Sequence, residues 1–146
     1  MKTRVLIVDD EDEFVQVLSE RLTLRDFDVT TVSSGAGAIE EVENYNFDIV
    51  ILDVQMPGIS GIDVLREIKT LKPLIEVIML TGHATVDTAI EGMRLGAYDF
   101  LLKPLDTDDL NAKICKASEH KAEHEERIRN AKVKEIISSP RSVLNK

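Results

Sequence analysis

Five short runs of strand-forming residues alternate with segments of helical periodicity along this chain of 146 residues. The runs cover residues 4–8, 28–32, 48–52, 75–80 and 97–102, and the helical patterns between and after them cover about residues 13–24, 34–45, 62–71, 84–95 and 106–117. Such alternation is typical of a parallel sheet with helices on both faces and right-handed crossovers. We therefore predict an α/β fold of the flavodoxin-like type, with five parallel strands in the order 2-1-3-4-5.

The third run ends in a carboxylate. Residues 49–52 are Ile-Val-Ile-Leu, Asp53 follows them directly, and a Pro-Gly turn comes at residues 57–58. A continuous apolar run bounded by turn residues indicates a strand buried on both faces. Because open α/β sheets bind ligands beyond the carboxyl ends of their strands, Asp53 is predicted to stand at a ligand-binding edge.

Other chemically active side chains follow the neighbouring strands. Asp9 and Asp10 end the first run, Thr81 ends the fourth and Lys103 ends the fifth. Taken alone, the aspartates and Thr81 beside Gly82 are typical of turns, and Lys103 before Pro104 is typical of a solvated strand-to-loop step. Three carboxylates in one place, however, raise one another's pKa and need compensation. A bound Mg2+ and the ammonium of Lys103 would supply it. This combination is typical of a phosphoryl-transfer site, which uses a metal, a lysine, a hydroxyl and a carboxylate nucleophile.

Four short motifs resemble the receiver domain of two-component response regulators, most closely that of the nitrogen-regulatory enhancer-binding class. They are VDD at residues 8–10, LDVQMPG at 52–58, LTG at 80–82 and FLLKP at 100–104. The resemblance covers about residues 3–120, with the motifs in the family's order. It implies a signalling switch that catalyses only its own phosphoryl transfer and autodephosphorylation, and is not otherwise an enzyme.

The resemblance also implies roles for individual residues. Asp53 would accept a phosphoryl group from the phosphohistidine of a sensor histidine kinase. Asp9, Asp10 and Asp53 would bind Mg2+, with the backbone carbonyl of Gln55 as a further ligand.

Three more roles concern the readout of the phosphoryl group. Lys103 would pair with the phosphoryl oxygens, and its peptide bond to Pro104 would be cis, as in the family. Thr81 would move to bond the phosphoryl group, and Phe100 would swing inward behind it. Gln55 and His83 flank the site and could tune attack by water, in a direction that the sequence leaves open.

Composition limits the possible partners. The net charge of -9 argues against a nucleic-acid-binding surface on this chain alone. The chain has no apolar run of membrane-spanning length, so we expect no membrane association. The single cysteine, Cys115, fits a reducing, cytoplasmic setting, and we expect it to pack on a helix face.

The sequence is predicted to comprise a receiver domain, residues 1–120, and a helical extension with a linker or tail, residues 121–146. The last helix is expected to continue to about residue 137 because alanine and glutamate favour helices. A broken heptad seam runs through Leu110, Ile114, Ala117, Lys121, His124, Ile128 and Ala131. Its polar middle is compatible with a solvated helix, and the alternative is a homodimer contact through this helix. His120 and His124 are four apart, but no third metal ligand is evident, so they are expected to be surface residues.

Inward-facing stripes are also predicted for two earlier helices. Phe14, Val17, Leu18 and Leu22 share one face of residues 13–24. In the pattern that begins at residue 84 or 85, the corresponding stripe is Val86, Ala89, Ile90 and Met93.

Three functions from different classes fit these observations. The first is a phosphorylation switch that signals by binding an unidentified downstream effector. The second is the receiver half of a transcription regulator whose DNA-binding domain lies outside these residues. The third is a metal-dependent phosphatase with an aspartyl nucleophile, although such enzymes usually have a second Asp where Gln55 stands. A dinucleotide site at Gly35-Ala36-Gly37 is disfavoured because the third glycine of that motif is missing.

Overall fold

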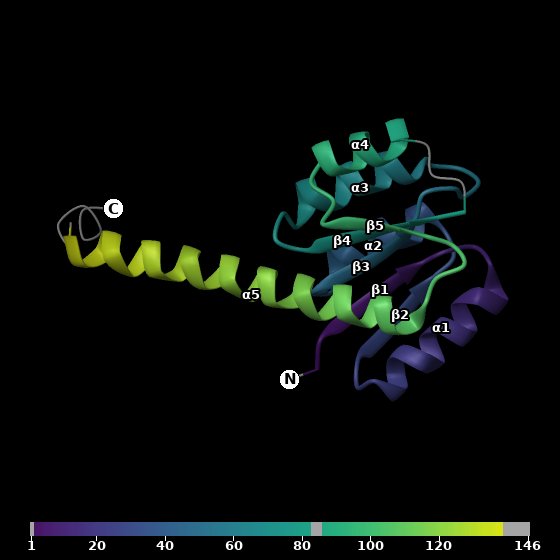
Figure 1. Cartoon of the computed structure of the whole chain (residues 1–146). Helices are drawn as coiled ribbons and strands as arrows, with labels where there is room; N and C mark the ends of the chain where they lie inside the picture. Colours follow the sequence, from purple (N-terminus) through teal and green to yellow (C-terminus); the bar gives the residue numbers. More distant parts are fainter. Residues whose placement is uncertain (1, 83–85, 139–146) are drawn as a thin grey trace.

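In the computed structural model, which describes residues 2–82 and 86–138, the chain forms one five-stranded parallel sheet flanked by helices (Figure 1). The strand order is β2-β1-β3-β4-β5, as predicted. The elements, in chain order, are β1 Arg4–Val8, α1 Asp12–Leu24, β2 Asp28–Val32, α2 Gly35–Asn44, β3 Ile49–Asp53, α3 Gly61–Leu71, β4 Glu76–Thr81, α4 Val86–Arg94, β5 Asp99–Leu102 and α5 Thr107–Ser138.

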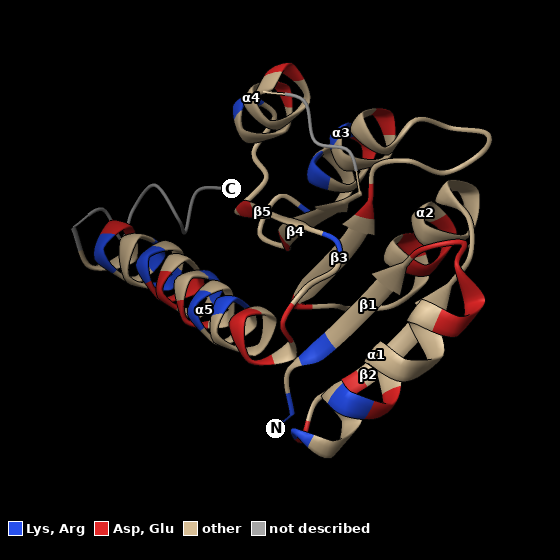
Figure 2. Ribbon diagram, turned by 45° about the vertical axis from the view of Figure 1, so that its right-hand side comes forward, with Lys and Arg blue, Asp and Glu red and all other residues tan. Residues whose placement is uncertain are grey.

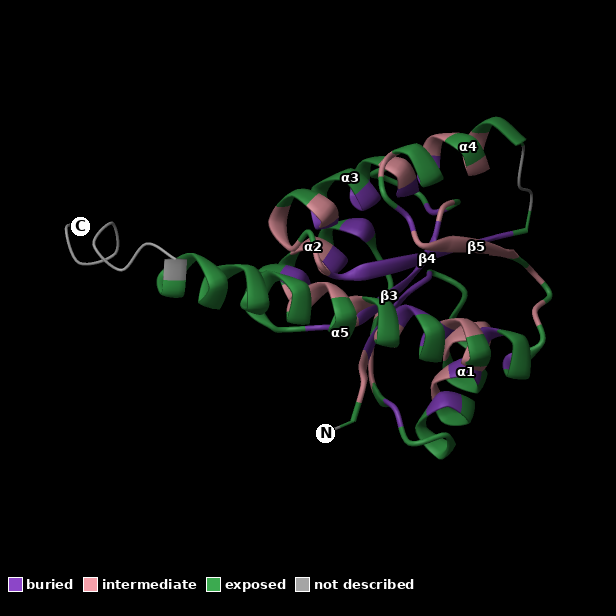
Figure 3. Cartoon of the chain, turned by 60° about the vertical axis from the view of Figure 1, so that its left-hand side comes forward, coloured by how far each residue is buried: buried purple, intermediate pink, exposed green. Residues whose placement is uncertain are grey.

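Alternation of side chains along the strands divides the core into two layers. On one face, Leu6, Val50 and Val77 pack with apolar residues of α2 and α3. On the other face, Val5 and Ile49 pack with residues of α1 and α5. Every residue of β3 and β4 is buried (Figure 3), which explains their continuous apolar sequences.

Local signals position two helices beside the sheet. The Ser34 hydroxyl accepts a hydrogen bond from the amide of Gly37 at 3.0 Å and caps α2, and Ser60 caps α3 through the amide of Asp63 at 3.2 Å. Gly61 opens α3 against the loop that follows β3. A Cβ at Gly61 would lie 2.4 Å from the Cα of Val54, so only glycine fits this approach.

The predicted stripe of α1 is only partly correct. Leu18 and Leu22 are buried, as expected, but Val17 is 46% exposed, so its inward placement was wrong. Phe14 is half-buried and packs at the edge of the core. Helical periodicity marks a broad apolar face, and only the part that touches the sheet is buried.

The predicted stripe of α4 is wrong at three positions. Val86, Ile90 and Met93 are exposed, while Gly92 faces the core, where a Cβ would meet the side chain of Met79. The helix thus approaches the sheet through its smallest residue. The region between β4 and α4, residues 83–85, contains His83 and the predicted start of this helix, and lies outside the described residues.

The last helix, α5, is much longer than the receiver core requires and projects beyond it (Figure 1). Leu110, Ile114 and Ala117 are buried against the sheet, so the first half of the predicted seam is used within the chain. Cys115 is exposed, which overturns its predicted packing on a helix face. Among the described residues, no helix combines the length and hydropathy that a bilayer span needs.

Two side-chain contacts tie α5 to the edge of the sheet opposite Asp53. Lys121 Nζ lies 3.2 Å from Asp48 before β3 and 3.1 Å from Glu125 on its own helix. His120 Nδ1 lies 3.3 Å from the buried carboxylate of Glu76, the first residue of β4. The helix is continuous across residue 120, so the predicted domain boundary falls inside α5.

Candidate functional site: a carboxylate cluster with one lysine

The carboxyl ends of β1 and β3 bring three acids together. β1 pairs directly with β3, so Asp9 and Asp10 of the first loop lie beside Asp53. One carboxylate oxygen from each of the three lies within 4.8 Å of the others. Asp9 and Asp53 are buried, whereas Asp10 is exposed. The red loop after β1 and the red end of β3 mark this region in Figure 2.

Backbone amides fix the two buried carboxylates. The amide of Glu11 donates to Asp9 Oδ1 at 2.9 Å, and the amide of Gln55 donates to Asp53 Oδ1 at 3.0 Å. Each bond leaves the other oxygen of the carboxylate for a different partner. The two aspartates therefore have defined orientations within the same site.

Lys103 supplies the positive charge. Its Nζ lies 2.7 Å from Asp9 Oδ2, 2.9 Å from Glu11 Oε1 and 3.5 Å from Asp53 Oδ2. It also lies 4.4 Å from the centroid of the Phe14 ring, within cation–π distance. The peptide bond from Lys103 to Pro104 is cis, as the resemblance implies.

The pKa of Asp53 is raised above its usual value, chiefly because burial disfavours the carboxylate, and the charge of Asp9 adds to this. The Gln55 amide and Lys103 act in the opposite direction. For Lys103, burial alone would lower the pKa, but hydrogen bonds and charges from Asp9, Glu11 and Asp53 together raise it. The lysine therefore remains an ammonium at neutral pH.

The acids fit a divalent cation. Asp9 Oδ2 is buried and makes no hydrogen bond of good geometry with residues 2–82 or 86–138, although the Lys103 ammonium lies at ion-pair distance. The buried Asp9 oxygen with its spare lone pairs, the buried carboxylate of Asp53 and the exposed carboxylate of Asp10 form an oxygen-rich set with room for water. Mg2+ prefers such a set, since it keeps several of its waters.

The remaining predicted residues lie on β4, on β5 and in the loop after β3. Thr81 is buried at the end of β4, where Leu80 pairs with Asp53 across the sheet. Phe100 is half-buried in β5, opposite Met79, and packs against the core. Gln55 is exposed, two residues after Asp53, and its backbone amide holds the Asp53 carboxylate.

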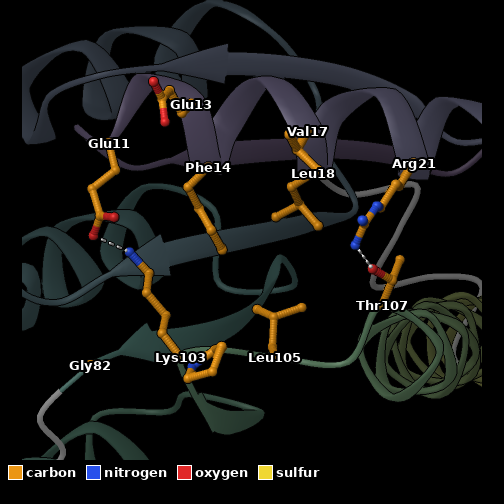
Figure 4. Close-up of a pocket in the computed structure, with 11 residues that line it drawn as sticks. Glu11, Glu13, Phe14, Val17, Leu18, Arg21, Gly82, Lys103, Leu105 and Thr107 are labelled. Atoms are coloured by element: carbon orange, nitrogen blue, oxygen red, sulfur yellow. Dashed lines mark hydrogen bonds and ion pairs between the residues drawn. The ribbon is translucent and has the colours of Figure 1, made fainter.

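A groove of about 580 Å3 opens beside the lysine, between α1 and the loop from β5 to α5 (Figure 4). Its apolar floor includes Phe14, Leu18 and Leu105, and charged groups stand at both ends. Arg21 closes one end by donating to the Thr107 hydroxyl at 3.1 Å.

Sequence reasoning missed two contributors to the site. Glu11 is a direct partner of Lys103, and Phe14 stacks beneath the ammonium. An acidic run that continues past Asp10 was a usable signal for Glu11. Phe14 was assigned only to the core.

Comparison with known proteins decides the family. The profile of the response regulator receiver domain matches residues 5–115, which is most of the chain. The chain belongs to the response regulator receiver domain family. This confirms the resemblance that the four motifs carry.

The relatives of this receiver domain include enhancer-binding response regulators. Over 116 residues it is 40% identical to the transcriptional regulatory protein ZraR of Escherichia coli K12, covering 80% of this chain and 26% of that protein. Over 122 residues it is 33% identical to the DNA-binding transcriptional regulator NtrC of the same organism, covering 84% and 26%. The receiver domain thus spans about a quarter of the length of these relatives.

One solved structure also matches the long last helix of this receiver domain. The crystal structure of an adenylate cyclase from Rhodopirellula baltica has a TM-score of 0.78 and 28% sequence identity. The match covers 100% of this chain and 99% of that chain. The alignment to that structure therefore includes the residues of α5.

Proposed function

We propose that this receiver domain is a phosphorylation-activated switch in which Asp53 accepts a phosphoryl group from the phosphohistidine of a sensor histidine kinase. The observation that supports the proposal most directly is the convergence of Asp9, Asp10 and Asp53 on one lysine at the carboxyl edge of the sheet. Receiver domains of this family receive phosphoryl groups from histidine kinases, and the chemistry of the cluster suits that transfer.

Each side chain has a defined part in the transfer. The Asp53 Oδ2 oxygen, which no backbone amide of the described residues holds, is the nucleophile. Asp9, Asp10 and Asp53 would hold Mg2+, together with the Gln55 carbonyl. The ion, when bound, neutralises charge on the phosphoryl oxygens. Lys103 stands 3.5 Å from the acceptor oxygen and can bind a phosphoryl oxygen without moving far.

Thr81 and Phe100 are proposed to read the phosphorylation state. Thr81 ends the strand that pairs with β3, and Phe100 lies on the strand beyond it. A shift from 1:99 to 99:1 between two conformations takes about 5.5 kcal/mol of differential binding. New bonds from the phosphoryl group to the Thr81 hydroxyl and to Lys103, each worth roughly 1–3 kcal/mol, supply much of it.

The partners are proposed in the same terms. The groove between α1 and the β5–α5 loop gives a phosphodonor domain an apolar surface next to Lys103. The output passes to a downstream effector, or to a DNA-binding domain as in the relatives, which are transcription regulators about three times as long as this chain. We also propose self-association through the extension of α5.

The proposal is tested by labelling the purified chain with acetyl phosphate, with and without Mg2+. We expect Mg2+-dependent labelling of the wild type and none of Asp53→Asn. Asp63→Asn, an exposed acid at the start of α3, is the matched control and should label normally. Labelling that persists in Asp53→Asn would refute the assignment, and multiple turnover of a phosphomonoester would favour the phosphatase instead.

A further inference from the structure

Two imidazole rings lie on one face of α5, where this helix passes the start of β4. His120 and His124 are four residues apart, with ring centroids separated by 6.4 Å and ring planes inclined at 51°. His120 is exposed and His124 is half-buried. Side chains four apart on a helix share a face, so both rings can reach a common ligand. Histidine pairs at this spacing bind metal ions in helical sites.

A buried carboxylate orients the first of these rings. His120 Nδ1 lies 3.3 Å from Oε2 of Glu76, whose side chain is only 7% exposed. The ring of Tyr98 packs on the His120 ring, with centroids 5.7 Å apart. A carboxylate beside Nδ1 favours the tautomer with its proton on that nitrogen, which leaves the lone pair of Nε2 to bind a metal. Metal-binding histidines usually have such a supporting carboxylate, because it fixes the ring and makes it a stronger ligand.

The charge around the two rings favours a cation. Residues 119–126 hold four glutamates and one lysine. That lysine, Lys121, lies 3.2 Å from Asp48 and 3.1 Å from Glu125, so carboxylates balance its charge. A positively charged ligand is therefore attracted to this part of the helix.

We infer that His120 and His124 bind one divalent transition-metal ion such as Zn2+, with Glu76 as a positioning residue and water in the other coordination positions. Imidazole nitrogen suits Zn2+, Ni2+ and Cu2+, whereas Mg2+ prefers oxygen ligands. The histidine pair thus selects a different class of ion from the acids around Asp53, which lie at the other edge of the sheet. A bound ion would link residues 120–124 of α5 to β4 through Glu76. Its binding does not depend on phosphoryl transfer.

NMR of the imidazole nitrogens tests the site in the full chain. Cys115→Ser removes an exposed thiol that would compete for the ion, and millimolar Mg2+ competes at the carboxylate cluster. When Zn2+ is added, we expect the ring signals of His120 and His124 to shift together and to saturate at one ion per chain. The bound nitrogen of His120 should be Nε2. Ring signals that stay unchanged at one equivalent of Zn2+ would overturn the inference.

Zinc affinity, measured by competition with a chromophoric chelator, tests the need for two rings on one face. His124→Gln should weaken binding, because a single imidazole remains in the site. Ala122→His added to His124→Gln restores the number of histidines but places the second ring on the opposite face, since residues two apart on a helix do not face each other. It should not restore the affinity. Equal affinity in this double variant and in the parent protein would overturn the inference.

The positioning role of Glu76 has its own readout. Glu76→Gln should weaken Zn2+ binding by about 10–100-fold, as loss of a supporting carboxylate does. In the absence of metal, the same variant should lower the share of His120 rings with the proton on Nδ1, which NMR measures directly. Glu119→Gln, which neutralises an exposed acid next to His120, is the control and should change neither quantity appreciably. Unchanged affinity in Glu76→Gln would refute the positioning role.

Discussion

Replacing Lys103 with methionine should lower the free energy of unfolding, because it leaves the buried acids of the cluster without their positive partner. The Lys103 ammonium lies 2.7 Å from Asp9 and 3.5 Å from Asp53, whose side chains are 0% and 4% exposed. Removing one partner of a buried ion pair costs about 3–5 kcal/mol, because the remaining charge is left unpaired. We take about 3 kcal/mol, the lower end, since Asp10 and the neighbouring groove give water access to the site.

The expected loss has a measurable size. For a domain of this length, about 3 kcal/mol corresponds to a fall in Tm of roughly 10–15 °C. Thermal unfolding followed by circular dichroism in EDTA at neutral pH measures it. Mg2+ should recover much of the loss, because a ligand at 100 times its Kd stabilises a protein by about 2.7 kcal/mol. The loss should also shrink in acid, where Asp53 takes up its proton.

Two controls separate this effect from loss of an ordinary surface lysine. Lys113→Met removes an ion pair with Asp99 in which both side chains are about one-third exposed, and it should cost no more than about 1 kcal/mol. Glu11→Gln removes the exposed partner of Lys103 and should cost even less. A Lys103→Met protein whose Tm falls by less than about 2 °C in EDTA would refute the reasoning.

Three further predictions concern other parts of the chain. Asp53→Asn should raise the Tm at neutral pH in EDTA. Burial raises the pKa of the Asp53 carboxyl, so the wild-type protein is most stable in acid, where Asp53 is protonated, and loses stability as the pH rises through the folded pKa. The Tm difference between Asp53→Asn and the wild type should therefore vanish near pH 4 in a pH series of melting curves. Gly61→Ala should destabilise by about 2–3 kcal/mol in urea unfolding, because its Cβ would overlap the backbone of Val54. Lys121→Met should cost about 1 kcal/mol and speed amide hydrogen exchange in residues 121–137, since it releases α5 from Asp48; unchanged exchange would contradict this anchoring role.

The fold could be predicted from the sequence because alternating periodicity and a parallel sheet leave few topologies. The gathering of the site residues at the edge of the sheet that carries Asp53 could also be predicted from the sequence, since parallel strands end on the same side. Predicted strand ends differ by one or two residues, as at β5, which begins at Asp99 instead of residue 97. Hydrogen bonding between neighbouring strands determines where a strand begins and ends, and the type of a single residue does not indicate whether it makes those bonds.

Other features depend on contacts that span long stretches of sequence. The close approach of Gly92 to the Met79 side chain determines which face of α4 packs on the sheet. An apolar stripe in the sequence does not indicate that Val86 and Ile90 stay exposed. The anchoring of Lys121 on Asp48 joins residues 73 positions apart. The first half of the predicted seam of α5 lies against the sheet, which covers Leu110, Ile114 and Ala117.

The most direct test of the phosphoacceptor role is to locate the phosphoryl group itself. The wild-type chain is incubated with acetyl phosphate and Mg2+, and the number and position of phosphoryl groups are determined by mass spectrometry of the intact chain and its peptides. We predict one group per chain, on Asp53, and none when EDTA replaces Mg2+. A phosphoryl group on any other residue, or labelling that is unchanged in EDTA, would contradict the account.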